Sequence, residues 1–412
     1  MITPAYLSSG QAQILPRLAL DFTTGLLDPR ITFTRASIGT RVNPSGLVET
    51  MIANTPRFDY DPVTLAPKGL LIEEQRTNAI TYSEDFGNAI WTKSNASIAT
   101  DTTTAPSGAV TADTLIENTA NSTHFVQYAL SVPAVAAVFS FYAKKKERSK
   151  ISFGGAGFGG QGFAAVWDLN NGTIFTNTGN KASIQALSNG WYRCSVAFTP
   201  SNASGAVVFL CDDTGNITYT GDGTSGVYLW GFQSENGAIL TSYIPTTTVA
   251  VTRNLDLATM TGTNFSSWFN ASQGAFSVAS QRSVAGDGLT AFPPVLEAVN
   301  SGSSNTNMII QWANGTGEIF LFSQIAGAGQ AFITKPGLTA TAAHKSCYAY
   351  KASDYAYTSD GLTPGTAGGS VPTVDVLNIG SQSVTFAING WISKVLYWPQ
   401  RVINNEVQAF SK

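Results

Sequence analysis

The chain has 412 residues, of which 43% are hydrophobic and only 12% are charged, about half the usual charged share. The net charge of −3 argues against the clustered Lys and Arg that a broad nucleic-acid interface requires, and the hydrophobic content excludes a disordered chain. Thr, Ser, Asn and 39 Gly replace the missing charge. Because these residues suit strands and tight turns better than helices, the composition predicts an all-β protein.

Residues 1–80 are rich in Pro and Arg and predict short strands broken by turns. A first hairpin is expected over residues 31–52, with its turn at Asn43–Gly46, and a second over residues 56–74. These strands are too short and too polar to bury a core of their own. We therefore predict an N-terminal attachment segment that packs on a neighbouring domain or on a partner chain.

Glu73 and Glu74 follow the second hairpin and raise the question of a catalytic acid pair. Neighbouring residues on a strand point to opposite faces, whereas glycoside hydrolysis needs two carboxyl groups about 5–9.5 Å apart that face the same sugar. A structural join fits the spacing better. In this interpretation one carboxylate pairs with Arg76 or Arg57, and the other faces water.

Residues 81–253 contain longer runs in which polar and apolar residues alternate, separated by Gly, Asn, Asp or Pro. In Trp191–Phe198, for example, alternate residues form one apolar face. Alternation of period two over this length predicts strands with one buried face, and regularly spaced strands predict a sandwich. We assign residues 81–253 to a first antiparallel β-sandwich that resembles a carbohydrate-binding module.

A short turn-rich stretch in this unit brings together four oxygen-bearing side chains, which are Asp212, Asp213, Asn216 and Asp222. Hard oxygen ligands of this kind suit calcium, so the stretch is a candidate calcium site and calcium is the one cofactor considered. The alternative is an Asp- and Gly-rich hairpin turn that needs no ion.

Residues 254–412 repeat the strand pattern and predict a second sandwich, which ends in a short helix over Val402–Phe410. Sugars are recognised by exposed aromatic rings beside amides and carboxylates. The aromatic residues in less regular or alternating contexts are the carbohydrate-binding candidates Trp268, Trp312, Tyr355 and Tyr357. Burial in the core is the alternative for each of them.

Other chemistry has little support in the sequence. Two histidines and three cysteines show no zinc, redox or nucleophile spacing, and we expect buried free thiols. The glycine-rich stretch Gly154–Gly162 lacks the Lys-Ser/Thr of a phosphate loop and predicts a loop between strands. The basic run Lys144–Lys150 is interpreted as a solvated turn or charged edge rather than a polyanion site.

No stretch predicts export or membrane insertion. The first residues have neither the basic nor the apolar region of a secretory signal, and the longest apolar run, Val132–Ala143, is too short to span a bilayer. These features predict a protein that is made in a reducing cytoplasm and is not inserted into a membrane.

Several segments, in the same order, resemble bacteriophage virion proteins of the head-spike or tail-fibre kind. They are FTRASIGTRVNPSGLVE, PRFDYDPVTLAPKGLLIEEQRTN, TYSEDFGNAIWTKSNASI and GVYLWGFQSENGAILTSYIPT. The last unit, with HKSCYAYKASDYAYTSDG and INGWISKVLYWPQRVINNEVQAFSK, is similar to the concanavalin A-like (laminin-G-like) jelly roll. The chain departs from concanavalin-like hydrolases, because it lacks their strand on which two glutamates and an aspartate alternate.

The resemblance implies a virion adhesin, made in the host cytoplasm and attached to other virion proteins through residues 1–80. We expect a non-enzymatic structural protein that contacts host surface carbohydrate, and a homo-oligomer, with a trimer favoured because fibres multiply weak contacts. A carbohydrate-binding module and a polysaccharide depolymerase or other glycan hydrolase are the alternatives.

Overall fold

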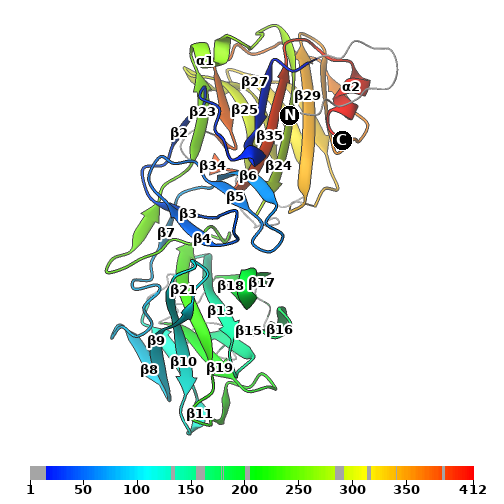
Figure 1. The fold of residues 1–412 in the computed structure, drawn as a ribbon. Coiled ribbons are helices and arrows are strands. Elements are labelled where there is room, and N and C mark those ends of the chain that lie inside the picture. Colours follow the sequence, from blue (N-terminus) through cyan, green and yellow to red (C-terminus); the bar gives the residue numbers. More distant parts are fainter. Residues whose placement is uncertain are drawn as a thin grey trace.

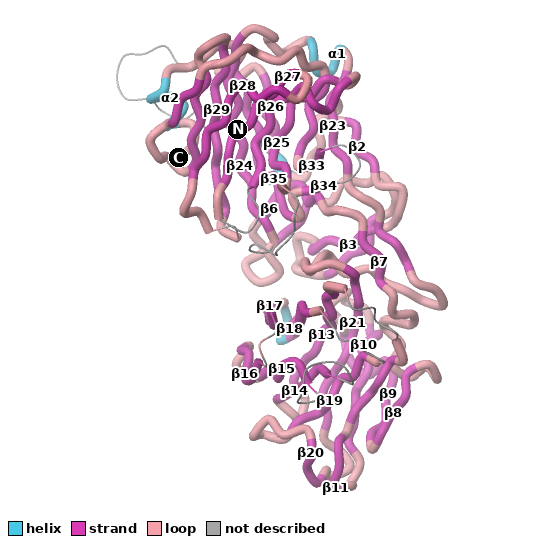
Figure 2. The backbone as a smooth tube through the Cα atoms, turned by 180° about the vertical axis from the view of Figure 1, so that it is seen from behind, coloured by secondary structure: helices cyan, strands magenta, loops and turns pink. Residues whose placement is uncertain are grey.

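The computed structural model describes residues 15–130, 135–154, 163–177, 179, 181–199, 205–283, 292–312, 317–339, 341–382 and 386–412. Its regular structure is almost entirely β-strand, and the strands pair antiparallel in several sheets, which confirms the all-β prediction. The chain forms two stacked lobes, each built from strands (Figures 1 and 2). Residues 155–162 of the glycine-rich stretch lie outside the described residues.

One lobe, which we call the terminal sandwich, packs two large sheets face to face. In spatial order the first sheet contains β31 (Gly365–Ala367), β30 (Tyr355–Ser359), β29 (Ala343–Lys351), β24 (Gln273–Arg282), β35 (Gly390–Trp398), β6 (Pro67–Ile72) and β5 (Phe58–Tyr60), and β1 (Leu18–Asp21) also pairs with β35. The second contains β2 (Thr32–Thr34), β23 (Leu257–Thr261), β32 (Val376–Ile379), β25 (Pro294–Asn300), β26 (Ser303–Trp312), β27 (Ile319–Ile325) and β28 (Ala328–Lys335).

The core of the terminal sandwich follows from the alternation of its strands. On β29, Tyr348 and Tyr350 point between the sheets, whereas Cys347 and Ala349 point to the other face. That other face is covered by the helix α2 (Asn404–Ala409), and Phe410 stacks on Trp398 with ring centroids 4.2 Å apart. The predicted C-terminal helix is therefore confirmed.

The N-terminal segment of residues 1–80 is part of the terminal sandwich over much of its length. β1 and β6 pair with β35, β5 pairs with β6, and β2 pairs with β23. Both β35 and β23 lie more than 180 positions further along the chain. This segment therefore packs on residues 254–412, and its attachment to a partner chain stays a prediction. The hairpin of β3 (Gly39–Val42) and β4 (Val48–Met51) projects toward the second lobe (Figure 1).

The second lobe, which we call the middle sandwich, comes from one continuous stretch of chain. Its first sheet contains β17 (Lys181–Ala186), β18 (Trp191–Phe198), β13 (Ala137–Lys145), β21 (Gly226–Asn236), β10 (Val110–Glu117) and β9 (Ala96–Thr104). Its second contains β16 (Thr173–Asn177), β15 (Phe163–Asp168), β14 (Lys150–Gly154), β19 (Ala206–Cys211), β12 (Phe125–Tyr128) and β8 (Trp91–Ser94). A core rich in Phe and Trp fills the space between them.

The chain enters and leaves the middle sandwich through a two-stranded ribbon. In this ribbon β7 (Arg76–Asn78) pairs with β22 (Val251–Arg253), so that Asn78 lies opposite Val251. Smaller pairs complete the described strands: β11 (Asn121–Thr123) with β20 (Thr218–Thr220), and β33 (Ser381–Gln382) with β34 (Phe386–Ala387).

The remaining helical elements are short. They are α1 (Thr263–Ser266) and two 3-10 turns at Phe22–Thr24 and Ser188–Gly190. No helix among the described residues is long and apolar enough to cross a membrane. All three cysteines are buried and unpaired, as expected.

Candidate functional site

Glu73 lies at the end of β6 and is buried between the two sandwiches. Its carboxylate lies 2.6 Å from the Arg253 guanidinium and 2.8 Å from that of Arg57, and it accepts two hydrogen bonds of 2.7 Å from Ser242. Burial by itself would raise the pKa of Glu73, but these two cations and Ser242 lower it to about 2. Glu73 is therefore a charged structural group.

Glu74 points the other way and pairs with Arg76, one of the two partners that the sequence suggested. The expectation that one glutamate faces water is wrong for Glu73, which is only 3% exposed, because Arg253 approaches it from 180 positions away. Each glutamate has its own cationic partner, which is compatible with the predicted structural join.

Glu73 belongs to a larger ionic group, here called the junction cluster, which consists of Arg35, Arg57, Glu73, Arg253 and Asp256. Asp256 accepts a hydrogen bond from Arg35 at 3.0 Å and pairs with Arg57, and it also accepts the main-chain N–H of Glu73 at 3.0 Å. The cluster has three guanidinium groups and two carboxylates, all of them buried. It therefore keeps one excess positive charge beneath the surface at the point where the sandwiches meet.

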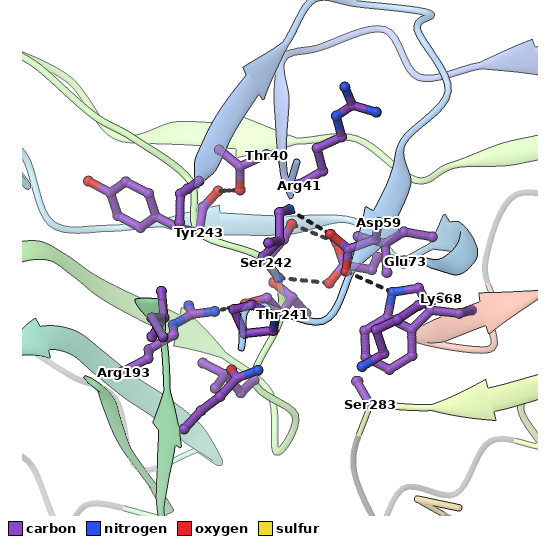
Figure 3. A pocket seen from close by; sticks show the side chains of 18 of the residues that line it. Thr40, Arg41, Asp59, Lys68, Glu73, Arg193, Thr241, Ser242, Tyr243 and Ser283 are labelled. Carbon is purple, nitrogen blue, oxygen red and sulfur yellow. Dashed lines mark hydrogen bonds between the residues drawn. The ribbon is translucent and has the colours of Figure 1, made fainter. Parts of the chain in front are cut away.

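Beside the junction cluster, a pocket of about 480 Å³ opens between the two sandwiches. We call it the junction pocket (Figure 3). The terminal sandwich contributes Lys68 and Trp391, among others, and the middle sandwich contributes Tyr142, Arg193 and the loop that carries Ser242. The pocket thus exists only because the two sandwiches are held together.

Trp391 on β35 is the aromatic wall of the junction pocket, and it is only partly buried. Its indole N–H donates to Asp59 at 2.8 Å, and the Lys68 ammonium lies 3.3 Å from its ring centroid. Burial lowers the pKa of Lys68 and raises that of Asp59, which also accepts the Val42 N–H at 2.6 Å.

Gly69 lets Lys68 come this close to Trp391. Its φ is +106°, and a Cβ at this position would lie 2.4 Å from the carbonyl oxygen of Ile392. Only glycine combines that conformation with so close an approach of β6 to β35.

Two carboxylates, Asp59 and Glu73, line the same pocket, and their pKa values are shifted in opposite directions. Such a pair can serve an acid and a nucleophile or base in hydrolysis. Here, however, both oxygens of each carboxylate accept hydrogen bonds from the protein. The arrangement is better suited to hold the pocket in shape than to transfer protons.

The four carbohydrate-binding candidates are buried, so their rings are not available to stack on a sugar. Trp268 and Trp312 are 2% and 1% exposed, and Tyr355 and Tyr357 are fully buried. The prediction is corrected for all four: the alternation of the strands turns the tyrosines between the sheets, and Trp268 packs against Tyr397.

Trp391, by contrast, is not among the carbohydrate-binding candidates from the sequence, and the structure places it in the pocket wall. The signal that could have found it is strand alternation. Ile392 is buried, so its neighbours Trp391 and Ser393 lie on the opposite face of β35.

The carboxylates of two calcium candidates, Asp212 and Asp222, already accept hydrogen bonds within their own turns. Asp212 accepts the main-chain N–H groups of Thr214 and Asn216, both at 2.9 Å, and Asp222 caps a separate turn through Ser225. Hydrogen bonds from Ser225 hold the pKa of Asp222 well below its usual range. All four candidates, including Asp213, are described residues. Among the described residues, no group of three or more His, Cys, Asp or Glu could hold a metal. The turn alternative fits this geometry.

No protein-family model and no curated protein sequence matches the chain. Solved structures show a distant likeness. The Ruminococcus gnavus IT-sialidase CBM40 bound to alpha2,3 sialyllactose is 12% identical, with 35% of this chain and 84% of that chain covered and a TM-score of 0.30.

Two further structures have a similar likeness. A Trypanosoma rangeli sialidase in complex with the inhibitor DANA is 9% identical, with 73% of this chain and 60% of that chain covered and a TM-score of 0.29. Mouse laminin alpha1 chain, domains LG4-5, is 10% identical, with 69% and 88% covered and a TM-score of 0.24. Scores this low assign no function, and nothing in these comparisons bears on a bacteriophage origin.

Proposed function

We propose that this chain is a non-enzymatic adhesion protein of a bacteriophage virion, a head spike, decoration or tail fibre, whose junction pocket binds host surface carbohydrate. The observation that carries the proposal is the partly exposed Trp391 ring in a pocket of about 480 Å³, whose largely apolar walls also carry polar and charged side chains. A sugar offers apolar C–H faces to such a ring and hydroxyl groups to the side chains around it.

The rigid join between the sandwiches supports a role in display. The junction cluster links residues 35–73 to residues 253–256, and Ser242 ties the middle sandwich to it through Glu73, Arg57 and Arg253. A fixed pocket loses little conformational entropy when it binds a ligand, which is an advantage for a surface that makes weak and repeated contacts.

The segments that resemble virion proteins are largely the segments that build this junction. Residues 33–49 contribute Arg35, residues 56–78 contribute Arg57 and Glu73, and residues 226–246 contribute Ser242. Three of the four segments therefore contribute residues to the junction on which the proposal rests.

The virion assignment has a direct test. We expect the chain to be found in purified phage particles, attached to other virion proteins and trimeric, because trimers multiply weak glycan contacts. Mass spectrometry of purified particles measures its presence, and the mass of the isolated protein at micromolar concentration measures the oligomer. Absence from particles would contradict the assignment, and a monomeric mass would contradict the trimer.

Glycan binding is tested with Trp391→Ala on an array of host surface glycans. We expect the affinity to fall about tenfold or more, because stacking and burial of one ring face are lost. Trp391→Phe keeps a ring without the N–H and should retain most of the binding. Phe332→Ala, an exposed ring outside the pocket, is the matched control. No binding of any glycan by the unaltered protein would refute the proposal.

Glycan hydrolysis is the second candidate, because Asp59 and Glu73 line one pocket with their pKa values shifted apart. Release of reducing ends from a bound glycan, abolished in Asp59→Asn, would establish it. Binding without such release is the outcome that our proposal expects.

A further inference from the structure

The charged side chains of the junction pocket carry an excess of positive charge. Its walls include four cationic residues and two carboxylates, although the whole chain has a net charge of −3. One of the carboxylates, Glu73, is already paired with Arg57 and Arg253 of the junction cluster, which itself has an excess guanidinium group. A cleft with this lining attracts anions. The cationic residues in the walls are Arg41, Lys68, Arg193 and Arg282.

Lys68 differs from Arg41 and Arg193 in the partners of its charged group. Arg41 pairs with Glu49 at 2.8 Å, and Arg193 donates to a main-chain carbonyl at 2.8 Å. Lys68 makes no hydrogen bond or salt bridge with any residue that the structure describes, and its ammonium lies instead over the Trp391 ring. Asp59 and Asp61 attract this half-buried ammonium through space, but neither forms a salt bridge with it, so it can still gain a strong hydrogen bond from an anion.

A second pocket, which we call the hairpin pocket, lies on the other side of Lys68. It has a volume of about 660 Å³ and shares Lys68 and Gln281 with the junction pocket. Its walls add Lys345 and Lys412 as well as Asp61 and Asp360, and the Lys345 ammonium donates a hydrogen bond to the main-chain oxygen of Lys412 at 3.0 Å. Two pockets that share a wall, with lysines in both, suit a ligand that carries anionic groups at intervals along its length.

We infer that the two pockets together bind an acidic glycan, an oligosaccharide with carboxylate or sulfate groups, and that the ammonium of Lys68 pairs with one of these groups. The inference rests on the proposed function and narrows its ligand to one chemical class. Trp391 contacts the sugar ring, and Lys345 pairs with an acidic group further along the chain of sugars.

The test measures binding of three probes to the full chain by calorimetry. Oligogalacturonate carries carboxylates, dextran sulfate carries sulfates, and dextran is neutral. We expect one acidic probe to bind and dextran to bind at least tenfold more weakly, because a charge-assisted hydrogen bond is lost. Raising NaCl from 50 to 500 mM should weaken the acidic probe, since the groups are partly solvated.

Substitutions locate the binding. Lys68→Gln should weaken the acidic probe about tenfold, whereas Lys351→Gln, an exposed lysine outside both pockets, should leave it unchanged. Lys345→Gln should weaken a long acidic oligosaccharide and leave galacturonic acid monomer unaffected. Thermal unfolding of each variant checks that the fold is intact.

The outcomes separate this inference from the proposed function. If neutral glycans bind as well as acidic ones and Lys68→Gln has no effect, the acidic class is wrong and glycan binding stands. An equal loss in Lys351→Gln also overturns the inference, because the attraction is then not local. If no glycan of either kind binds, the proposed function fails as well.

Discussion

The two sandwiches are built from the chain in opposite ways. The terminal sandwich takes strands from residues 18–72 and 257–398, so its core joins the two ends of the chain. The middle sandwich takes all of its strands from residues 91–236. Both have apolar cores, but the junction between them contains the buried ionic cluster in addition to an apolar contact of Val48 with the middle sandwich. Hydrogen-bonded ion pairs require a specific geometry. They therefore fix the relative orientation of the two sandwiches more closely than an apolar contact would.

This difference predicts unequal dependence on residues 15–75. Removing them takes four strands and the buried Leu18, Phe22, Leu70 and Ile72 from the terminal sandwich, which should no longer fold. The middle sandwich keeps every strand and should stay folded. Hydrogen exchange resolved along the chain measures this, and protection of both units after the deletion would contradict the shared-core description.

A smaller loss is expected when the ionic junction is broken. Asp256→Ala leaves Arg35 and Arg57 buried with one carboxylate fewer, and it should lower the free energy of unfolding by about 3–5 kcal/mol. Urea unfolding measures this. The matched control is Asp28→Ala, which removes a surface pair with Arg30 and should cost no more than about 1 kcal/mol. Equal effects of the two substitutions would refute the role of burial.

Gly69→Ala tests the close approach within the terminal sandwich alone. The new Cβ would collide with the main chain at Ile392, so we expect a loss of about 2–3 kcal/mol in that unit and weaker glycan binding. Gly327→Ala has a similarly positive φ of +82° but nothing within 4 Å of the Cβ, and should cost only about 1 kcal/mol. The difference between the two isolates the steric contact.

The two regions should also respond to pH in opposite directions. The pKa of Glu73 is lowered to about 2, so its stabilisation of the junction is present above about pH 4.5 and is lost as the pH falls toward 2. Burial, aided by Asp101 and Asp85, raises the pKa of Asp113 in the middle sandwich to about 6. Its stabilisation is present below about pH 4 and is lost as the pH rises through 6.

Region-resolved hydrogen exchange at pH 3, 5 and 7.5 measures these two trends. Asp113→Asn should remove the loss of protection in the middle sandwich between pH 5 and 7.5, whatever its effect on overall stability. An unchanged pH dependence in that variant would show that another group is responsible.

Local signals in the sequence were sufficient for elements whose partners are close along the chain. The hairpin turn at Asn43–Gly46, the strand Trp191–Phe198 and the helix that became α2 all depend on neighbouring residues. The pairing of β2 with β23 was not predictable in this way, because its strands lie more than 220 positions apart and three-residue strands carry little pattern.

The candidate site shows the same limit. Strand geometry predicted that Glu73 and Glu74 would act separately, but the approach of Arg253, 180 positions away, has no local signal. The aromatic candidates failed because residue type does not distinguish a ring turned between two sheets, as Tyr357 is, from one turned outward, as Trp391 is. Only the register of β35 with its neighbours decides which face is covered.

The ribbon of β7 and β22 sets the start and finish of the middle sandwich side by side. A unit tethered at two adjacent points can be exchanged for another without rerouting the rest of the polypeptide. Grafting a different module between Asn78 and Val251 would preserve the terminal sandwich, provided that the replacement supplies a hydroxyl group at the position of Ser242. The terminal sandwich is in this sense a scaffold on which the middle sandwich can be replaced by another module.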